Sequence, residues 1–297
     1  MNLKKLQNKF SSLNKIATIV ETEKNVTLIN ILRLSKQNIL YSNHTMQSKY
    51  LIDQIMNQYD LNHPFLKTSK YKDKYPTLWI YITEEEKYQT NPYFKQEKSM
   101  LRYFNISRDA IVAIGKRAND FAKKNNFKIV FTAQENDVET LAQVLPKFIK
   151  SFLELNQYCN VNFVLNSSKV KMDAVPVLPL DSFNLKLDLT TNFIPEDIQF
   201  NKLKVYPNVN LFINSQIHSY LTFVTLTLLS ESIIISEKYK LVAQNQKIND
   251  LEKKQSDLKR QIMREKRELE IEQMSILSNK KDLLHNQKGG EYEQNTR

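Results

Sequence analysis

Both ends of this chain lack the two residue types that interrupt helices. Of its 297 residues, 3 are glycine and 8 are proline, and neither type occurs in residues 1–63 or 208–288. A proline inside a helix costs about 3 kcal/mol and a glycine about 1 kcal/mol. All the prolines lie between Pro64 and Pro207. The sequence therefore predicts a long helix at each end and a middle of different construction.

The apolar residues at both ends follow the heptad spacing of coiled coils. At the N-terminus, eight of ten a and d positions are apolar; at the C-terminus, six of seven a positions but only two of six d positions are. A helix over residues 209–286 would be roughly 115 Å long, too long for one globular domain to bury. We expect an antiparallel coiled coil of the two ends, the alternative being two separate amphipathic helices packed on the middle. The seam is expected at Phe10, Leu13, Ala17, Val20, Ile262, Leu269 and Ile276.

The middle of the chain alternates strand-like and helix-like segments. Strands are expected at Leu78–Ile82, Ala110–Ile114, Lys128–Phe131 and Val161–Leu165, and helices at about 93–104, Lys116–Asn125 and Val138–Leu155. This alternation predicts a Rossmann-like α/β domain with a mainly parallel sheet. A fifth run, Ala174–Leu180, holds two prolines and belongs at a sheet edge or in a loop. The expected domains are the N-terminal coiled-coil helix 1–63, the α/β domain 64–207, the C-terminal coiled-coil helix 208–288 and a flexible tail 289–297.

Composition argues against catalysis by this chain. The glycines Gly115, Gly289 and Gly290 cannot form a Walker loop or a G-x-G-x-x-G turn. One cysteine, Cys159, excludes an internal disulfide, and four scattered histidines offer no close pair of metal ligands. The acidic run Glu84–Glu86 has no histidine or serine nucleophile beside it in sequence. We expect no catalytic residue, no metal and no cofactor.

The net charge of +11 admits two explanations. It is typical of proteins with an anionic partner, such as nucleic acid, a membrane surface or an acidic protein surface. Codon bias also explains it, since 35 lysines face only 8 arginines. The first residues, Met1–Lys9, do not resemble a secretory signal, and the uncharged stretch Val205–Ser230 contains too many polar residues for a bilayer span. A cytoplasmic protein, soluble or peripheral to a membrane, is expected.

Several short segments resemble one family, the γ subunit or central stalk of F-type ATP synthases. The resemblance covers about residues 3–280 in one consistent order. It rests on Lys9–Leu13 in the first helix, on Ile111–Phe121 (IVAIGKRANDF), on Asn162–Leu180 (NFVLNSSKVKMDAVPVLPL), on Tyr206–Pro207 before the last helix, and on Ser236–Glu237 and Lys266–Glu268 within it. The family's glycine-cysteine-glycine turn after its first strand is missing from Thr83–Asn91 (TEEEKYQTN). Such departures indicate a divergent paralogue, as in the F-like rotary motors of wall-less bacteria.

The resemblance implies a non-catalytic rotor shaft, one copy per hexamer of α- and β-like nucleotide-binding subunits. The α/β domain would dock a small ε-like stalk subunit and a membrane-side rotor or connector. The complex would be peripheral on the inner face of the cell membrane, making ATP, transporting protons or driving a specialised machine such as gliding. No nucleic acid is implied. Bearing and torque contacts with the hexamer are expected at Glu21, Glu23, Lys24, Arg260, Arg264, Lys266, Arg267 and Glu268.

Two other functions compete with the shaft. A dinucleotide-dependent enzyme would need a glycine-rich turn after its first strand, and Thr83–Asn91 has none. A basic coiled-coil adaptor for nucleic acid or cytoskeletal partners agrees with the long helices and the isoelectric point of about 9.4. Such an adaptor would bind polyanions with a steep inverse dependence on salt.

Overall fold

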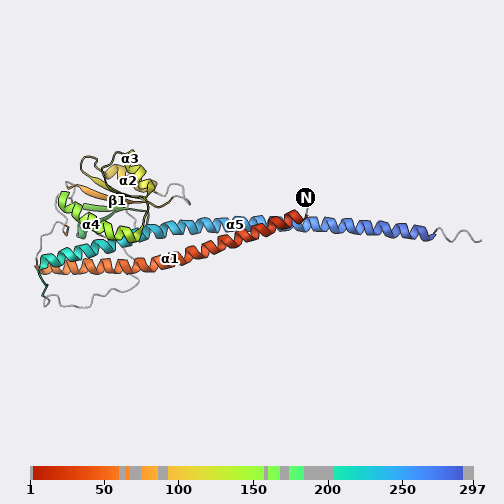
Figure 1. Cartoon of the computed structure of the whole chain (residues 1–297), viewed down its shortest axis with the longest axis horizontal. Helices are drawn as coiled ribbons and strands as arrows, with labels where there is room; N and C mark the ends of the chain where they lie inside the picture. The colour runs from red at the N-terminus through yellow and green to blue at the C-terminus, as the bar shows by residue number, and fades with distance from the viewer. Residues whose placement is uncertain are drawn as a thin grey trace, which may run out of the picture. The chain divides into compact units, whose positions relative to one another are not determined.

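The two terminal helices are the largest elements of this computed structural model. It describes residues 3–59, 65–66, 75–85, 93–156, 160–167, 174–183 and 204–289, with side chains to residue 278 in the last range. Helix α1 spans Leu3–Tyr59 and helix α5 spans Val209–Gly289 (Figure 1). Between them the chain forms β1 (Thr77–Ile82), α2 (Phe94–Tyr103), β2 (Ala110–Ile114), α3 (Lys116–Lys124), β3 (Ile129–Ala133), α4 (Val138–Asn156), β4 (Asn160–Val164), β5 (Val175–Leu178) and the short helix η2 (Leu180–Ser182).

The strands form one sheet in the order β3-β2-β1-β4-β5. β1 pairs in parallel with both β2 and β4, and β2 pairs in parallel with β3. Only β5 is antiparallel, on β4, and Pro176 lies in it at the sheet edge, where a missing N–H is tolerated. The predicted fold class is confirmed: a Rossmann-like α/β domain is inserted between two long helices. Observed strand and helix ends differ from the expected ones by one or two residues.

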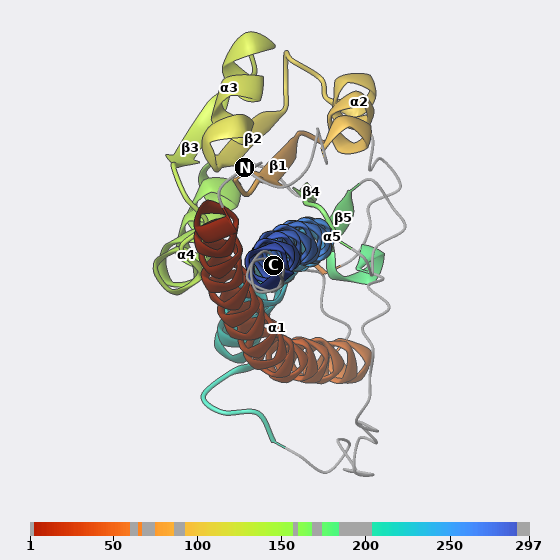
Figure 2. The same ribbon diagram turned by 90° about the vertical axis from the view of Figure 1, so that its right-hand side faces the viewer.

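The two faces of the sheet bury different sets of helices. Trp79 and Tyr81 of β1 belong to a cluster with Met100 of α2 and Ala118 of α3. The alternating residues Leu78, Ile80 and Ile82 belong to a larger cluster that includes α4, the end of α1 and the start of α5. This alternation follows from the strand period of two residues. Figure 2 shows the resulting layers, with α2 and α3 on one side of the sheet and α4 and α5 on the other.

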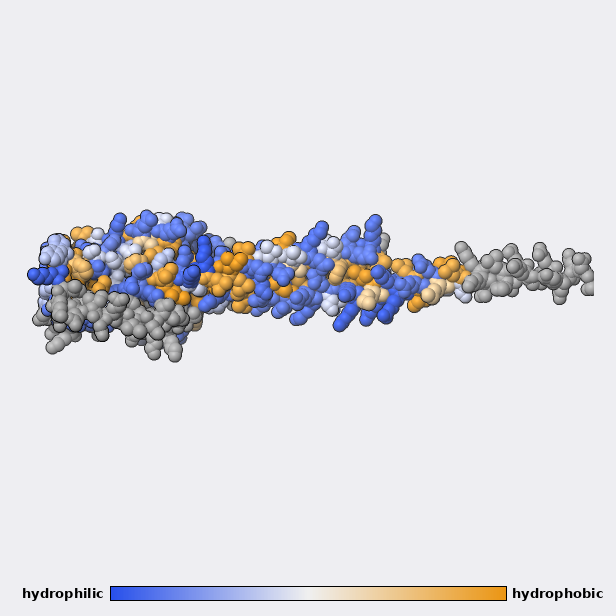
Figure 3. All heavy atoms as spheres, turned by 90° about the horizontal axis from the view of Figure 1, so that it is seen from below, coloured by the Kyte–Doolittle hydropathy of each residue, from blue (hydrophilic) through white to orange (hydrophobic). Residues whose placement is uncertain are grey.

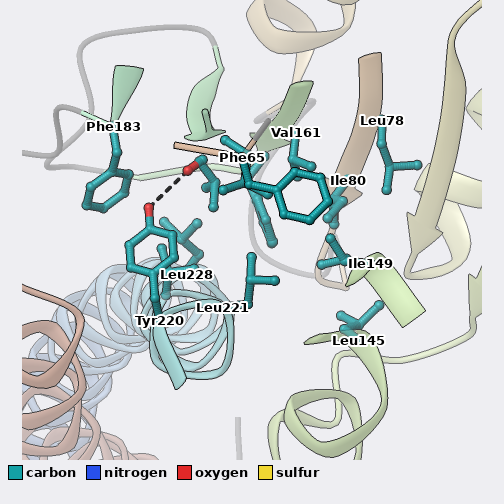
Figure 4. Close-up of a cluster of buried hydrophobic side chains, with 14 of the residues drawn as sticks. Phe65, Leu78, Ile80, Leu145, Ile149, Val161, Phe183, Tyr220, Leu221 and Leu228 are labelled. Atoms are coloured by element: carbon teal, nitrogen blue, oxygen red, sulfur yellow. Dashed lines mark hydrogen bonds between the residues drawn. The ribbon is translucent and has the colours of Figure 1, made fainter. Parts of the chain in front are cut away.

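The larger cluster ties α5 to the sheet. Leu221 and Leu228 of α5 lie in it with Val161 of β4 and Ile149 of α4, all at most 1% exposed (Figure 4). Tyr220 is fully buried, and its hydroxyl donates a 3.0 Å hydrogen bond to the carbonyl of Val177 in β5. The first third of α5 is therefore a core helix of the α/β domain.

Helices α1 and α5 run antiparallel where they pack beside the domain. The Asn38 amide donates to the carbonyl of Thr227 at 2.7 Å, and the rings of His44 and Phe223 stack at 4.8 Å. As residue numbers rise along α1, those of its contacts on α5 fall. Several buried residues of this part are small and polar, which allows two helix backbones to approach closely. They are Ser42, Thr45 and Ser48 on α1 and Thr225, Thr227, Ser230 and Ser232 on α5.

The chain divides into two compact units, Thr27–Leu241 and Met1–Val26 with Val242–Arg297. In the second unit the burial of α1 follows the predicted heptad. From Leu3 to Val26, the a and d positions are buried or half-buried and every other residue is exposed. Leu6 and Val20 are 1% and 8% exposed, and Phe10, Leu13 and Ala17 are half-buried. On α5 the matching seam holds Gln244, Ile248, Leu251, Gln255, Leu258, Ile262 and Glu265.

Two residues expected at the seam lie beyond its packed part. Leu269 and Ile276 are 42% and 52% exposed, and every side chain from Lys266 to Ser278 is exposed. Among the described residues, the first turns of α1 cover α5 only as far as Glu265. The heptad pattern continues along α5 after its helical partner has ended. The expected tail from residue 290 lies outside the described residues.

One helix in the described part of the chain is long and apolar enough to cross a membrane by length and composition. It contains an 18-residue window with a mean hydropathy of 1.4. This value is higher than we expected from the sequence, where Val205–Ser230 was considered too polar for a bilayer span. Of this window, 67% is buried within the protein. That burial matches the role of the first third of α5 as a core helix.

The seam contains one polar residue that we expect to lower its stability. Gln244 is 5% exposed at a d position, and its Oε1 has no hydrogen-bond partner. Because a buried unpaired acceptor costs about 1–3 kcal/mol, Gln244→Leu should raise the stability of the coiled coil by about 1 kcal/mol or more. Thermal unfolding followed by far-ultraviolet circular dichroism measures this. Gln246→Leu, at an exposed position two residues on, is the control and should give no such gain.

Candidate functional site

Two places on the described chain could carry function: the carboxyl edge of the sheet and the exposed distal part of α5. In doubly wound α/β folds, ligands bind outside the carboxyl ends of the strands where the strand order reverses. Here that point lies between β1 and β4, because β1 has β2 on one side and β4 on the other. An enzyme built on this sheet would be expected to have its site there.

The edge between β1 and β4 is occupied by α5. After β1, the Glu84 carboxylate accepts hydrogen bonds from Ser232 of α5 at 2.8 Å and from Asn136 at 2.6 Å. The Asn136 amide also donates to the carbonyl of Leu229. After β4, the hydroxyl of Ser167 donates to the buried Glu231 of α5 at 3.1 Å. We call Glu84, Asn136 and Ser167, with their partners on α5, the clasp.

The turn after β2 is also closed to a ligand. Gly115 has φ of 95°, and a Cβ there would lie 2.2 Å from the carbonyl oxygen of Thr83. The hydroxyl of Thr83 accepts the N–H of Ala118 in the first turn of α3. A phosphate bound at the start of a helix accepts hydrogen bonds from such N–H groups. Here the N–H of Ala118 is already bonded to Thr83. A glycine at position 115 thus allows the ends of β1 and β2 to lie close together.

Burial raises the pKa of the Glu84 carboxyl above its ordinary value, while the bonds from Asn136 and Ser232 oppose the shift. In the sequence, Glu84 stands out only as part of the acidic run Glu84–Glu86 directly after a buried strand. The clasp on α5 also had a sequence signal, the polar triplet Ser230–Ser232 within an apolar run. Within the residues that the structure describes, no group of three or more His, Cys, Asp or Glu side chains could hold a metal ion.

The distal part of α5 presents apolar side chains without a partner helix. Leu269, Ile271, Met274, Ile276 and Leu277 are between 42% and 71% exposed. Counting about 100° per residue, these five spread over roughly 220° of the helix circumference. A single coiled-coil partner would cover only a narrow stripe. Figure 3 shows apolar and hydrophilic side chains interleaved along the helices.

The charged residues expected to contact a hexamer are at the surface. Arg260, Arg264, Lys266, Arg267 and Glu268 are exposed on α5. Glu21 and Glu23 are exposed on α1, whereas Lys24, at an a position of the seam, is half-buried. All eight belong to the unit formed by Met1–Val26 and Val242–Arg297. Their contacts with other subunits stay predictions.

No family model matches the sequence. A protein of Ureaplasma parvum serovar 3, named "Uncharacterized protein UU050", is 34% identical over 262 residues, which cover 85% of this chain and 86% of that protein. The chain belongs to the family of that protein.

Three solved structures are similar in fold at low identity. A chain of the Euglena gracilis mitochondrial ATP synthase, from a structure of OSCP, F1 and c-ring, has a TM-score of 0.46 at 14% identity and covers 99% of this chain and 98% of its own. A chain of the rotor of the same enzyme has a TM-score of 0.42 at 15% identity, and the match covers 90% of this chain and 98% of that chain. A chain from a structure of the central stalk and c-ring of the Tetrahymena thermophila mitochondrial ATP synthase has a TM-score of 0.47 at 12% identity. This match covers 77% of this chain and 98% of that chain.

The raised pKa of Glu84 gives a pH test of the clasp. A carboxyl whose folded pKa is raised contributes stability below its ordinary value of 4.5, and this contribution is lost as the pH rises through the raised value. Glu84→Gln keeps an acceptor but cannot ionise. Its stability relative to the unaltered protein should therefore increase as the pH rises above 4.5.

The fluorescence of Trp79, the chain's single tryptophan and buried in β1, reports unfolding of the α/β domain between pH 4 and 8. Glu85→Gln, at the exposed neighbour, is the control and should follow the unaltered protein. A Glu84→Gln profile that also follows it would contradict a raised pKa of Glu84 in the folded protein.

Proposed function

We propose that this chain is the γ-like central rotor shaft of an F-type or F-like rotary ATPase. The distal part of α5 lies inside a hexamer of α- and β-like nucleotide-binding subunits, with one copy of the chain per hexamer. The chain is not catalytic, and ATP is hydrolysed or made in the surrounding subunits. The proposal is supported by the sequence resemblance and by the geometry of α5.

The observation that carries the proposal is the distribution of exposed apolar residues from Leu269 to Leu277. A helix that docks on one surface needs one apolar face, and the a and d stripe of a coiled coil is narrower still. Apolar side chains over more than half of the circumference require protein on several sides. A sleeve formed by a ring of subunits supplies that enclosure.

The packing of the rest of α5 agrees with a shaft. A helix that transmits torque must be held against bending and slipping. The seam with α1 supports α5 up to Glu265. Within the other unit, the clasp and the apolar core fix α5 to the sheet. The enzyme alternative is disfavoured because α5 occupies the sheet edge where a ligand would bind.

The finer parts of the proposal concern partners and location. The α/β domain docks a small ε-like subunit and a membrane-side rotor or connector, and the complex is peripheral on the inner face of the cell membrane. The driven process is ATP synthesis, proton transport or a specialised machine such as gliding. The membrane-side proteins that co-purify would distinguish these processes.

The first experiment is a native pull-down of the tagged chain in about 0.5 M salt, where purely electrostatic binding is largely screened. Two P-loop subunits should co-elute, at about three copies of each per copy of this chain, and the eluate should hydrolyse ATP. A chain that elutes alone, or with nucleic acid that salt removes, would overturn the shaft in favour of the basic adaptor.

The apolar enclosure can be tested by three substitutions together, Ile271→Ser, Met274→Ser and Leu277→Ser. All three side chains are more than 60% exposed, so the free chain should keep its fold. Each substituted side chain loses apolar contact with the sleeve, at a cost of roughly 1 kcal/mol or more. The hexamer should therefore release the variant at least tenfold faster than the unaltered chain. The dissociation rate is measured with the hexamer immobilised on a surface, from the loss of bound chain as buffer flows over it.

Leu155→Ser and Val144→Ser on α4 serve as the control for this triple variant. They are 82% and 42% exposed and lie in the other unit. Their dissociation rate should equal that of the unaltered chain. An unchanged rate for the triple variant would exclude apolar enclosure of the distal helix.

The charged contacts have a separate test. Arg267→Ala should leave assembly intact but lower the torque or the coupling, because a guanidinium can form short, paired bonds with carboxylates. Single-molecule rotation of the reassembled complex under load measures the torque. Lys259→Ala, which removes one exposed charge outside the predicted contacts, is the control. Normal torque with Arg267→Ala would remove Arg267 from the contact.

A further inference from the structure

Residues 94–108, formed by α2 and the turn after it, expose apolar side chains on the outer side of the α/β domain. Phe94, Leu101, Tyr103 and Ile106 are between 54% and 64% exposed. Phe94 and Leu101 lie on α2 away from Met100, which packs inward, and Ile106 lies in the turn after the helix. We call this surface the α2 face.

The exposed charges of the α2 face are all positive. Lys95, Lys98, Arg102 and Arg108 are exposed among the apolar residues. Phe94, Lys98, Leu101 and Arg102 follow the spacing of one helix face, so basic and apolar groups alternate on the same surface. A surface of this kind attracts anions and offers apolar contact at once.

The one acidic residue of this segment, Glu97, and the acidic residue that follows it, Asp109, are turned inward. Glu97 accepts two bonds from the Arg117 guanidinium, at 2.7 and 2.8 Å, and one from the hydroxyl of Tyr81. Asp109, directly after the segment, is 2% exposed and accepts from Trp79 and from the backbone of Thr77 and Asn105. Both acids are thus used in bonds within the domain, and Asp109 Oδ1 also lies 3.6 Å from Nε of Arg108, while the basic side chains of the α2 face stay exposed.

We propose that the α2 face binds the surface of an anionic lipid bilayer. Long lysine and arginine side chains can reach phosphate head groups while neighbouring Phe94, Leu101 and Ile106 enter the boundary of the acyl chains. A protein interface fits less well, since lysine is depleted from the cores of such interfaces and Lys98 lies between Phe94 and Leu101. The proposal goes beyond the rotor shaft and does not depend on the hexamer.

The test is co-sedimentation of the purified full chain with phosphatidylcholine vesicles that contain about one third phosphatidylglycerol. The chain should bind these vesicles and should bind pure phosphatidylcholine vesicles at least roughly tenfold more weakly. Lys98→Glu with Arg102→Glu should lower binding by at least about tenfold. The chain's net charge of +11 makes a charge-matched control necessary.

The charge-matched control is Lys123→Glu with Lys124→Glu. Both lysines are exposed on α3, where no large apolar side chain is exposed among the described residues. This variant should keep most of the binding. Equal losses in the two variants would show general attraction by net charge and overturn a specific face.

A second variant changes apolar contact without changing charge. Phe94→Ser with Leu101→Ser should lower vesicle binding by roughly tenfold, and circular dichroism should show the fold retained because both side chains are exposed. Unchanged binding would contradict insertion into the bilayer boundary. No binding of the unaltered chain to anionic vesicles would overturn the proposal and favour an acidic protein as the partner of this face.

Discussion

The packing of α5 against the sheet is the interaction on which the rest of the α/β unit depends. Leu221 and Leu228 join the core of the sheet, while Thr227 meets Asn38 of α1. Residues 228–232 are all buried, so this stretch of helix has partners on every side. A helix in that position cannot be purely apolar, because it meets both a sheet edge lined by polar groups and a second helix at close range.

The clasp places α5 at the sheet edge where many doubly wound α/β folds bind a ligand. Parallel strands end at a common edge, and the groups after them face the same place. In this chain Glu84 and Ser167 use their hydrogen bonds on α5. An unpaired carboxylate there would carry a large desolvation cost, and the bonds from Ser232 and Asn136 offset part of it. Function therefore has to be sought on other surfaces of the chain.

The features that could be predicted from the sequence are those that depend on hydrophobic periodicity, namely the helices, the strands and their buried faces. Burial from Leu3 to Val26 follows the heptad position by position. Of the four parallel strands, β1, β2 and β4 are largely buried, whereas β3, at the sheet edge, is half-buried. The contacts between Asn38, Thr45 and Thr227 had no such signal, because small polar residues carry no hydrophobic period. The clasp was hidden for a related reason: a glutamate after a strand looks like a surface residue until the partner helix is placed.

The end of the seam could not be predicted from α5 alone. Leu269 and Ile276 continue its a positions, and only their exposure shows that no side chain of the described part of α1 covers them. This mismatch is informative about function. Selection for solubility would replace exposed leucine, isoleucine and methionine with polar residues if water surrounded them in the working state. In the proposed function these side chains would face a sleeve on several sides of the helix. Contacts that are spread out and individually weak would allow rotation there, whereas one closely packed face would hold the helix at a single angle.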